Sequence, residues 1–261
     1  MKRSSGVRLG ATAAVSVLSL ALVAGCSGGG SKGSEGSEKA DGKPAAKAVD
    51  AAELKKLIVA EGEVPGFEVG AVPATRSKPI TTDSAQCRPL ARVLSGLPPA
   101  DSAAQTDRLA TEKPAKKPTD GATSLDDMTD AKIEDTIGKS MDRDVTTVNL
   151  SSYDGEGAVK ALASVSGAIK ACTGGFTGEQ AGTAIKFIKV AEVKPAGTAD
   201  QSVAFTATTT SHGDTASVSG EVVRHGNTLA SYYTVNIGAM MAKKTYAVSA
   251  AVVKAQSAKL K

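Results

Sequence analysis

Three cysteines, two histidines and a few clustered carboxylates are the side chains of this chain that could do chemistry. Cys26 stands at the end of an apolar run that begins at about Leu9, behind a short basic N-terminal region. The run is too short to span a bilayer, and small residues before a cleavage point are typical of an export signal. We therefore expect residues 1–25 to be a cleaved signal peptide.

The four residues Val23-Ala24-Gly25-Cys26 resemble the lipobox of bacterial lipoproteins. The resemblance implies a diacylglyceryl group on the sulfur of Cys26, cleavage after Gly25, and acylation of the new N-terminus, for example by palmitate. It also implies a lipid-anchored, extracytoplasmic place on the outer face of the cytoplasmic membrane. Several acyl chains hold a protein stably where a single chain binds only marginally.

Cys87 and Cys172 are the two cysteines that remain. An exported chain meets an oxidising compartment, where an even pair of cysteines typically forms a disulfide. The alternative is two separate buried thiols. A bridge would close a loop of about 86 residues, to which the chain-entropy model assigns at most about 4–5 kcal/mol of stabilisation.

The other candidate ligands and catalytic groups lack the spacing that chemistry needs. His212 and His225 are predicted in turns at opposite ends of one strand, roughly 40 Å apart, so they do not share a metal ion or a catalytic site. The acidic cluster at 126–130 and the pair Asp142 and Asp144 lack the glycine and the terminal glutamate of a calcium loop. We expect no catalytic residue, no metal and no cofactor, although carboxylates that meet only in the fold could still form a hydrolase.

Residues 26–49 form a Gly/Ser/Lys/Glu-rich stretch that cannot bury enough apolar surface to fold, and we interpret it as a disordered tether. Its residues 28–33 match both G-x-G-x-x-G and G-x-S-x-G. Each pattern needs a strand before it and a helix after it, and a tether supplies neither. We therefore reject both as a nucleotide site or a nucleophile.

Charge and composition exclude some partners. The signal removes three of the 31 basic residues, which leaves 28 against 27 acidic ones and no argument for nucleic-acid binding. Aromatic residues make up 3% of the chain and tryptophan is absent. This weighs against sugar-binding sites that rely on aromatic faces.

Hydrophobic periodicity predicts a single α+β domain over residues 50–261. Asp50 and Glu53 have the form of a capping box, and Asp154 is predicted to cap the longest helix. Cys87 and Cys172 fall on apolar helical stripes, so a bridge would join two helices. The helices are expected at about 51–61, 84–95, 154–172 (with Val159 on its buried stripe) and 242–260. The strands are expected at 67–71 and 145–150, followed by a four-strand meander at 184–193, 201–210, 215–224 and 228–237. A mobile loop is expected at about 111–130.

This order of elements resembles the extracellular sensor domain of PknH-type kinases and related actinobacterial lipoproteins. The residues that carry the resemblance are Cys87-Arg88-Pro89-Leu90, Ala168-Ile169-Lys170-Ala171-Cys172 and Arg224-His225-Gly226-Asn227. The family implies an antiparallel sheet with helices packed against it and a cleft for an unidentified ligand. Its members often carry two disulfides and a tryptophan. This chain has cysteines for one such disulfide and no tryptophan.

We therefore expect a lipid-anchored, non-enzymatic binding or sensor-like domain with a small-molecule or envelope ligand in a cleft. The sequence predicts no nucleic-acid partner and identifies no protein partner. The alternatives are an envelope hydrolase that uses carboxylates and a structural or partner-docking lipoprotein. A deep apolar cleft would favour the first reading, a dry cleft with two close carboxylates the second, and an exposed apolar patch the third.

Overall fold

The computed structural model describes residues 46–76, 78–114, 138, 141–197, 201–211 and 214–260. The chain divides into two units, Met1–Gly42 and Lys43–Lys261, and every described residue belongs to the second. The predicted signal peptide, Cys26, most of the tether, His212 and the acidic cluster at 126–130 lie outside the described residues. They stay predictions.

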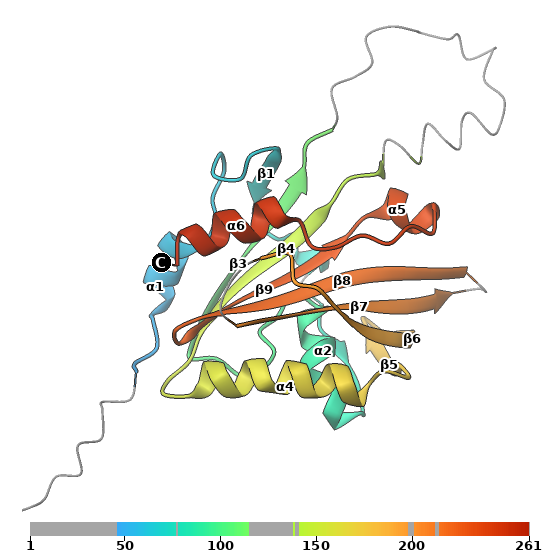
Figure 1. The fold of residues 1–261 in the computed structure, drawn as a ribbon, viewed down its shortest axis with the longest axis horizontal. Helices are drawn as coiled ribbons and strands as arrows, with labels where there is room; N and C mark the ends of the chain where they lie inside the picture. The colour runs from blue at the N-terminus through green and yellow to red at the C-terminus, as the bar shows by residue number, and fades with distance from the viewer. Residues whose placement is uncertain are drawn as a thin grey trace, which may run out of the picture. The chain divides into compact units, whose positions relative to one another are not determined.

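The described residues form one nine-stranded sheet with the order β1-β3-β4-β9-β8-β7-β6-β5-β2 (Figure 1). All neighbouring strands pair antiparallel, and β6 to β9 form the predicted four-strand meander. The strands are β1 (Phe67–Gly70), β2 (Ile80–Thr81), β3 (Ala104–Glu112), β4 (Val145–Ser152), β5 (Phe176–Gln180), β6 (Thr183–Val193), β7 (Ser202–Ser211), β8 (Asp214–His225) and β9 (Thr228–Val235).

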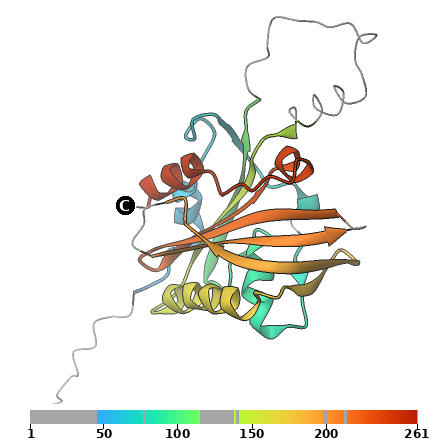
Figure 2. The same ribbon diagram turned by 45° about the vertical axis from the view of Figure 1, so that its right-hand side comes forward.

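Helices cover both faces of this sheet, with α1 and α6 on one side and α2 and α4 on the other (Figures 1 and 2). The helical segments are α1 (Ala51–Leu57), η1 (Ala74–Arg76), η2 (Ala85–Cys87), α2 (Arg88–Val93), α4 (Gly157–Ala171), α5 (Ile237–Met241) and α6 (Ala250–Ala258). The predicted α+β class, an antiparallel sheet with helices packed against it, is confirmed.

The alternation of side chains along the central strands builds two hydrophobic cores. Val222 contributes to the core under α2 and α4, whereas its neighbour Val223 contributes to the core under α1 and α6. Leu229 and Ala230 divide in the same way. Because successive strand residues point to opposite faces, these strands are apolar on both sides, as a sheet covered on both sides requires.

Helix α4 faces the sheet with a stripe that differs from the predicted one. Val159 was expected on it but is 47% exposed, because the buried stripe begins one residue earlier at Ala158 and continues through Leu162 and Val165. Asp154 does not cap the helix; its carboxylate accepts the N–H of Ala48 instead. The N-cap residue is Glu156, which makes no side-chain capping bond.

The last predicted helix, 242–260, is helical only over Ala250–Ala258, and a separate short helix, α5, ends just before the predicted range. Asn236 caps α5, which ends at Met241, and Lys243 has a φ of +52°, which stops a right-handed helix. The Tyr246 hydroxyl donates to the Ser217 carbonyl at 2.7 Å and so holds this segment against β8. Helix α6 starts only at Ala250.

Strands β2, β3 and β5 have no counterpart among the predicted elements. The mobile loop predicted at 111–130 is wrong at its start, because Thr111 and Glu112 pair within β3, and the rest from 115 lies outside the described residues. The capping box is half confirmed, since Asp50 Oδ1 accepts the N–H of Glu53 at 2.8 Å. The helix that it begins ends at Leu57, earlier than predicted.

Residues 46–49, which the sequence placed at the end of the tether, are hydrogen-bonded to the domain. Gly155 N–H donates to the Ala46 carbonyl, and Ser152 Oγ donates to the Val49 carbonyl at 2.5 Å. The chain therefore enters the domain beside the end of β4. Within the described residues, no helix combines the length and the apolarity needed to cross a membrane.

Candidate functional site

Cys87 and Cys172 form a disulfide, as predicted, and the reading as two separate buried thiols is wrong. Their Cα atoms lie 6.0 Å apart, and both residues are almost fully buried. The bond joins the residue before α2 to the residue after α4. It therefore fixes the ends of two helices that lie on the same face of the sheet.

The segment between β2 and η2 lies against the outer edge of β5. Thr81 pairs with Glu179 in the sheet, and β2 ends there after two residues. Beyond that point a side chain replaces the backbone ladder, because the Thr82 hydroxyl donates to the Thr177 carbonyl at 2.7 Å. Beyond this bond the segment and β5 diverge, and a cleft lies between them.

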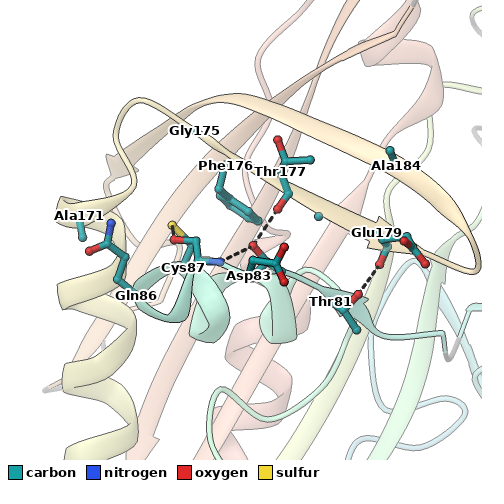
Figure 3. A pocket seen from close by; sticks show the side chains of 13 residues that line it. Thr81, Asp83, Gln86, Cys87, Ala171, Gly175, Phe176, Thr177, Glu179 and Ala184 are labelled. Atoms are coloured by element: carbon teal, nitrogen blue, oxygen red, sulfur yellow. Dashed lines mark hydrogen bonds between the residues drawn. The ribbon is translucent and has the colours of Figure 1, made fainter.

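This cleft has a volume of about 520 Å³ and lies between the segment 81–87 and β5 (Figure 3). Ala171 and Ala184 lie at its two ends, and the disulfide borders it through Cys87. The lining residues are Thr81, Thr82, Asp83, Ser84, Gln86, Cys87, Ala171, Gly175, Phe176, Thr177, Gly178, Glu179 and Ala184. Most of them are polar.

The chain turns tightly between α4 and β5 where it borders the cleft. Gly175 has a φ of +86°, and a Cβ there would lie 2.0 Å from the Phe187 carbonyl oxygen, so only glycine fits. The next residue, Phe176, is buried and stacks on Phe187 with ring centroids 4.6 Å apart. This pair and the disulfide hold the cleft in a fixed shape.

The charged lining residues of the cleft are Asp83 and Glu179, and no described residue that lines it is basic. These carboxylates, the Gln86 amide and the Thr177 hydroxyl make no hydrogen bond or ion pair through their side chains to the described residues, so they are free to meet a ligand. Both carboxylates are exposed to solvent. The cleft therefore suits a ligand that donates hydrogen bonds or carries positive charge, and it is not a dry acid pair.

The predicted pair Asp142 and Asp144 does come together in the fold. Both carboxylates accept from Nδ2 of Asn236, each at 3.0 Å, and Asn236 Oδ1 accepts the N–H of Ala239 in α5. Burial raises the pKa of Asp144 above its ordinary value, although the hydrogen bond from Asn236 partly offsets this increase. The cluster connects the start of β4 to α5, and no group of three or more His, Cys, Asp or Glu residues in the described parts of the chain could hold a metal ion.

A buried carboxylate that the sequence did not single out lies on the face of the sheet that α1 and α6 cover. Glu221 is 1% exposed in β8 and accepts the N–H groups of Ala196 at 2.8 Å and Gly197 at 3.2 Å. Burial raises the pKa of Glu221, while the two N–H groups lower it. The group lies far from solvent and anchors the chain between β6 and β7.

None of the cleft residues was predicted apart from Cys87, because they carry no motif. Of the predicted histidines, His225 ends β8. The only sequence signal for the cleft was the cysteine pair, which fixes two segments about 85 residues apart beside one another.

No protein-family model matches this chain, and no curated protein matches it. Among solved structures, the extracellular domain of PknH from Mycobacterium tuberculosis is similar, with 11% sequence identity and a TM-score of 0.48. The similarity covers 82% of this chain and 96% of that chain. It is a distant resemblance.

Proposed function

We propose that this protein is a lipid-anchored, extracytoplasmic binding domain that holds a small polar ligand in the cleft between segment 81–87 and β5, without converting it. The observation that carries the proposal is the cleft itself. It has unpaired acceptors, and the charged residues of its lining are acidic. Its volume of about 520 Å³ is within the range of small-molecule sites.

The ligand class follows from the lining. A deep apolar cleft would have favoured a binding domain, whereas this cleft is open and polar, so the proposal rests on its polar lining. Carboxylates at Asp83 and Glu179 attract amines, and the neighbouring Gln86 amide and Thr177 hydroxyl can bond hydroxyl groups. Amino sugars and amino acids of the cell envelope combine these groups.

The anchor rests on the sequence around Cys26, which lies outside the described residues. The sequence predicts a tether of roughly 20 residues between Cys26 and residue 46, and a Gly/Ser-rich coil of that length has an r.m.s. reach of about 25 Å. At that distance the cleft remains accessible to envelope molecules. The lipid anchor supplies the location, and the cleft supplies the binding.

An envelope hydrolase is the second candidate, and the Asp142 and Asp144 pair is the observation that favours it. One carboxyl with a raised pKa beside a second carboxylate is the arrangement of a general acid with its partner. Against it, Asn236 already bonds both groups, and neither carboxylate lines the cleft beside β5.

A docking lipoprotein is the third candidate. Three large apolar side chains are exposed to solvent: Met141 by 43%, Ile237 by 47% and Met241 by 56%. Ile237 and Met241 belong to α5. Met141 precedes Asp142, whose backbone lies close against Gly238 of α5. A partner that covers this patch would support a structural role.

Mass spectrometry of small molecules that co-purify with the native protein tests the proposal. The wild-type protein should retain a polar compound, and Ala184→Trp, which fills one end of the cleft, should lose it. Lys189→Trp on the same strand, outside the cleft lining, is the matched control and should retain it. Equal retention by both variants would place the ligand elsewhere.

A further inference from the structure

A row of polar side chains crosses three strands on the face of the sheet that α2 and α4 cover. Asp107 of β3 lies opposite Asn149 of β4, and Asn149 lies opposite Ser231 of β9. Directly opposite residues of antiparallel strands point to the same face, with Cβ atoms about 4.5–5.5 Å apart. The next partner in the row, Val222, belongs to the core under α2 and α4, which identifies the face.

Two atoms of this row are buried without a hydrogen-bond partner in the described residues. They are Asn149 Oδ1 and Ser231 Oγ, and each residue is only 2% exposed. An unpaired buried polar group costs about 1–3 kcal/mol, so native proteins pair nearly all of them. Since Asn149 and Ser231 lie directly opposite each other, these two unpaired oxygens are candidates to bond the same small molecule.

The third member of the row, Asp107, is a carboxylate that forms no ion pair with any residue in the described ranges. The Asp107 side chain is partly buried, and burial raises its pKa, while the adjacent Arg108 lowers it. Arg108 alternates to the opposite face, and its guanidinium donates to the backbone carbonyl of Asp107, not to the carboxylate. The row is therefore rich in acceptors and carries one negative charge.

The row is closed at Ser231 and open at its β3 end. Pairing of β1 with β3 stops at Leu109, so β3 has no outer neighbour at Asp107. Gln105, which accepts from Asn149 Nδ2 at 3.4 Å, is exposed there. A ligand that reaches the buried acceptors would enter past Asp107.

We propose that Asp107, Asn149 and Ser231 form a second binding site, separate from the cleft, for the ammonium head of a primary amine. An ammonium group is about the size of water and carries only donors, which matches two buried oxygen acceptors and a carboxylate at the entrance. Its charge compensates Asp107. None of the three residues lines the cleft, so the inference stands apart from the proposed function.

Thermal unfolding of the mature protein in methylammonium chloride and in tetramethylammonium chloride, at equal ionic strength, tests this site. Both probes carry one positive charge, but only methylammonium donates hydrogen bonds. The wild-type protein should unfold about 2 °C or more higher in methylammonium. Asp107→Asn and Ser231→Ala should each reduce the difference between the salts, and comparison of the two salts cancels any general salt effect.

Glu192→Gln is the matched control, because it removes an exposed carboxylate that belongs to neither the cleft nor the row. It should keep the methylammonium effect. The proposal is overturned if the wild type responds equally to both salts, if the full response survives in Ser231→Ala, or if Glu192→Gln abolishes it. A high-resolution structure in methylammonium that shows only a water between Asn149 Oδ1 and Ser231 Oγ would also overturn it.

Discussion

The backbone N–H of Val59 donates to the side-chain oxygen of Gln256 at 2.9 Å, although 197 positions separate the two residues. Gln256 Nε2 donates in turn to the Leu57 carbonyl at 2.9 Å, and the glutamine is fully buried. One amide of α6 thus satisfies the backbone at the end of α1. This bond fixes the two helices to each other on one face of the sheet.

Replacing Gln256 with Ala should lower the free energy of unfolding by about 2–4 kcal/mol, because the buried N–H of Val59 and the partly buried C=O of Leu57 both lose their partner. Urea unfolding followed by circular dichroism measures the loss. Lys254→Ala, at an exposed position of the same helix, should change stability by less than about 0.5 kcal/mol. A loss in Gln256→Ala no larger than in this control would show that the clamp is dispensable.

The free energy of unfolding of the double variant Cys87→Ser/Cys172→Ser should be about 3–5 kcal/mol lower than that of the oxidised wild type. The bond closes a loop of 85 positions, and a chain without it gains that conformational freedom when it unfolds. Reduced wild-type protein should match the variant. If oxidised and reduced protein unfold at the same denaturant concentration, the disulfide does not stabilise the fold.

Stability should depend on pH through Glu221. Burial raises the pKa of its carboxyl above the ordinary value of about 4.5, so the folded state binds its proton more tightly than the unfolded chain does. The free energy of unfolding should therefore fall as pH rises from about 4.5 through the raised pKa. Glu221→Gln, which cannot titrate, should lose this slope, while Glu192→Gln at an exposed position should keep it. Identical slopes for all three proteins would show that the Glu221 pKa is not raised.

Cys26→Ser should move the protein from the membrane fraction to the medium, or leave it as unprocessed precursor, since serine cannot form the thioether to a diacylglyceryl group. Immunoblotting of membrane and medium fractions measures this. Ser27→Ala, the adjacent hydroxyl, should leave anchoring unchanged. Normal processing and full membrane retention of Cys26→Ser would refute lipid attachment.

The meander and α4 could be predicted because their residues alternate or recur at one regular period, and the cysteine pair followed from two apolar helical stripes. Strand β3 could not be predicted in this way. Its sequence from Ala104 to Glu112 places Thr106, Asp107 and Arg108 among few apolar residues, and pairing with β1 and β4 keeps it in the sheet. Long-range pairing of this kind leaves no local pattern.

The cleft was unpredictable for a related reason. Thr82 and Thr177 are 95 positions apart, and only the short β2–β5 pairing and the disulfide bring them together. Their side chains are common surface types with no motif of their own. The family resemblance implied a ligand cleft without a position, and the cleft beside β5 and its polar lining come from the structure alone.

The most direct test of non-enzymatic binding in the cleft is to incubate the mature protein with a soluble cell-envelope extract and to analyse both the bound and the free small molecules by mass spectrometry. The wild type and Lys189→Trp should retain the same polar compound unchanged, with no new product in solution, and Ala184→Trp should retain none. The opposite result is a product that accumulates with wild-type protein and disappears with Asp144→Asn. It would make the protein a hydrolase and contradict the account.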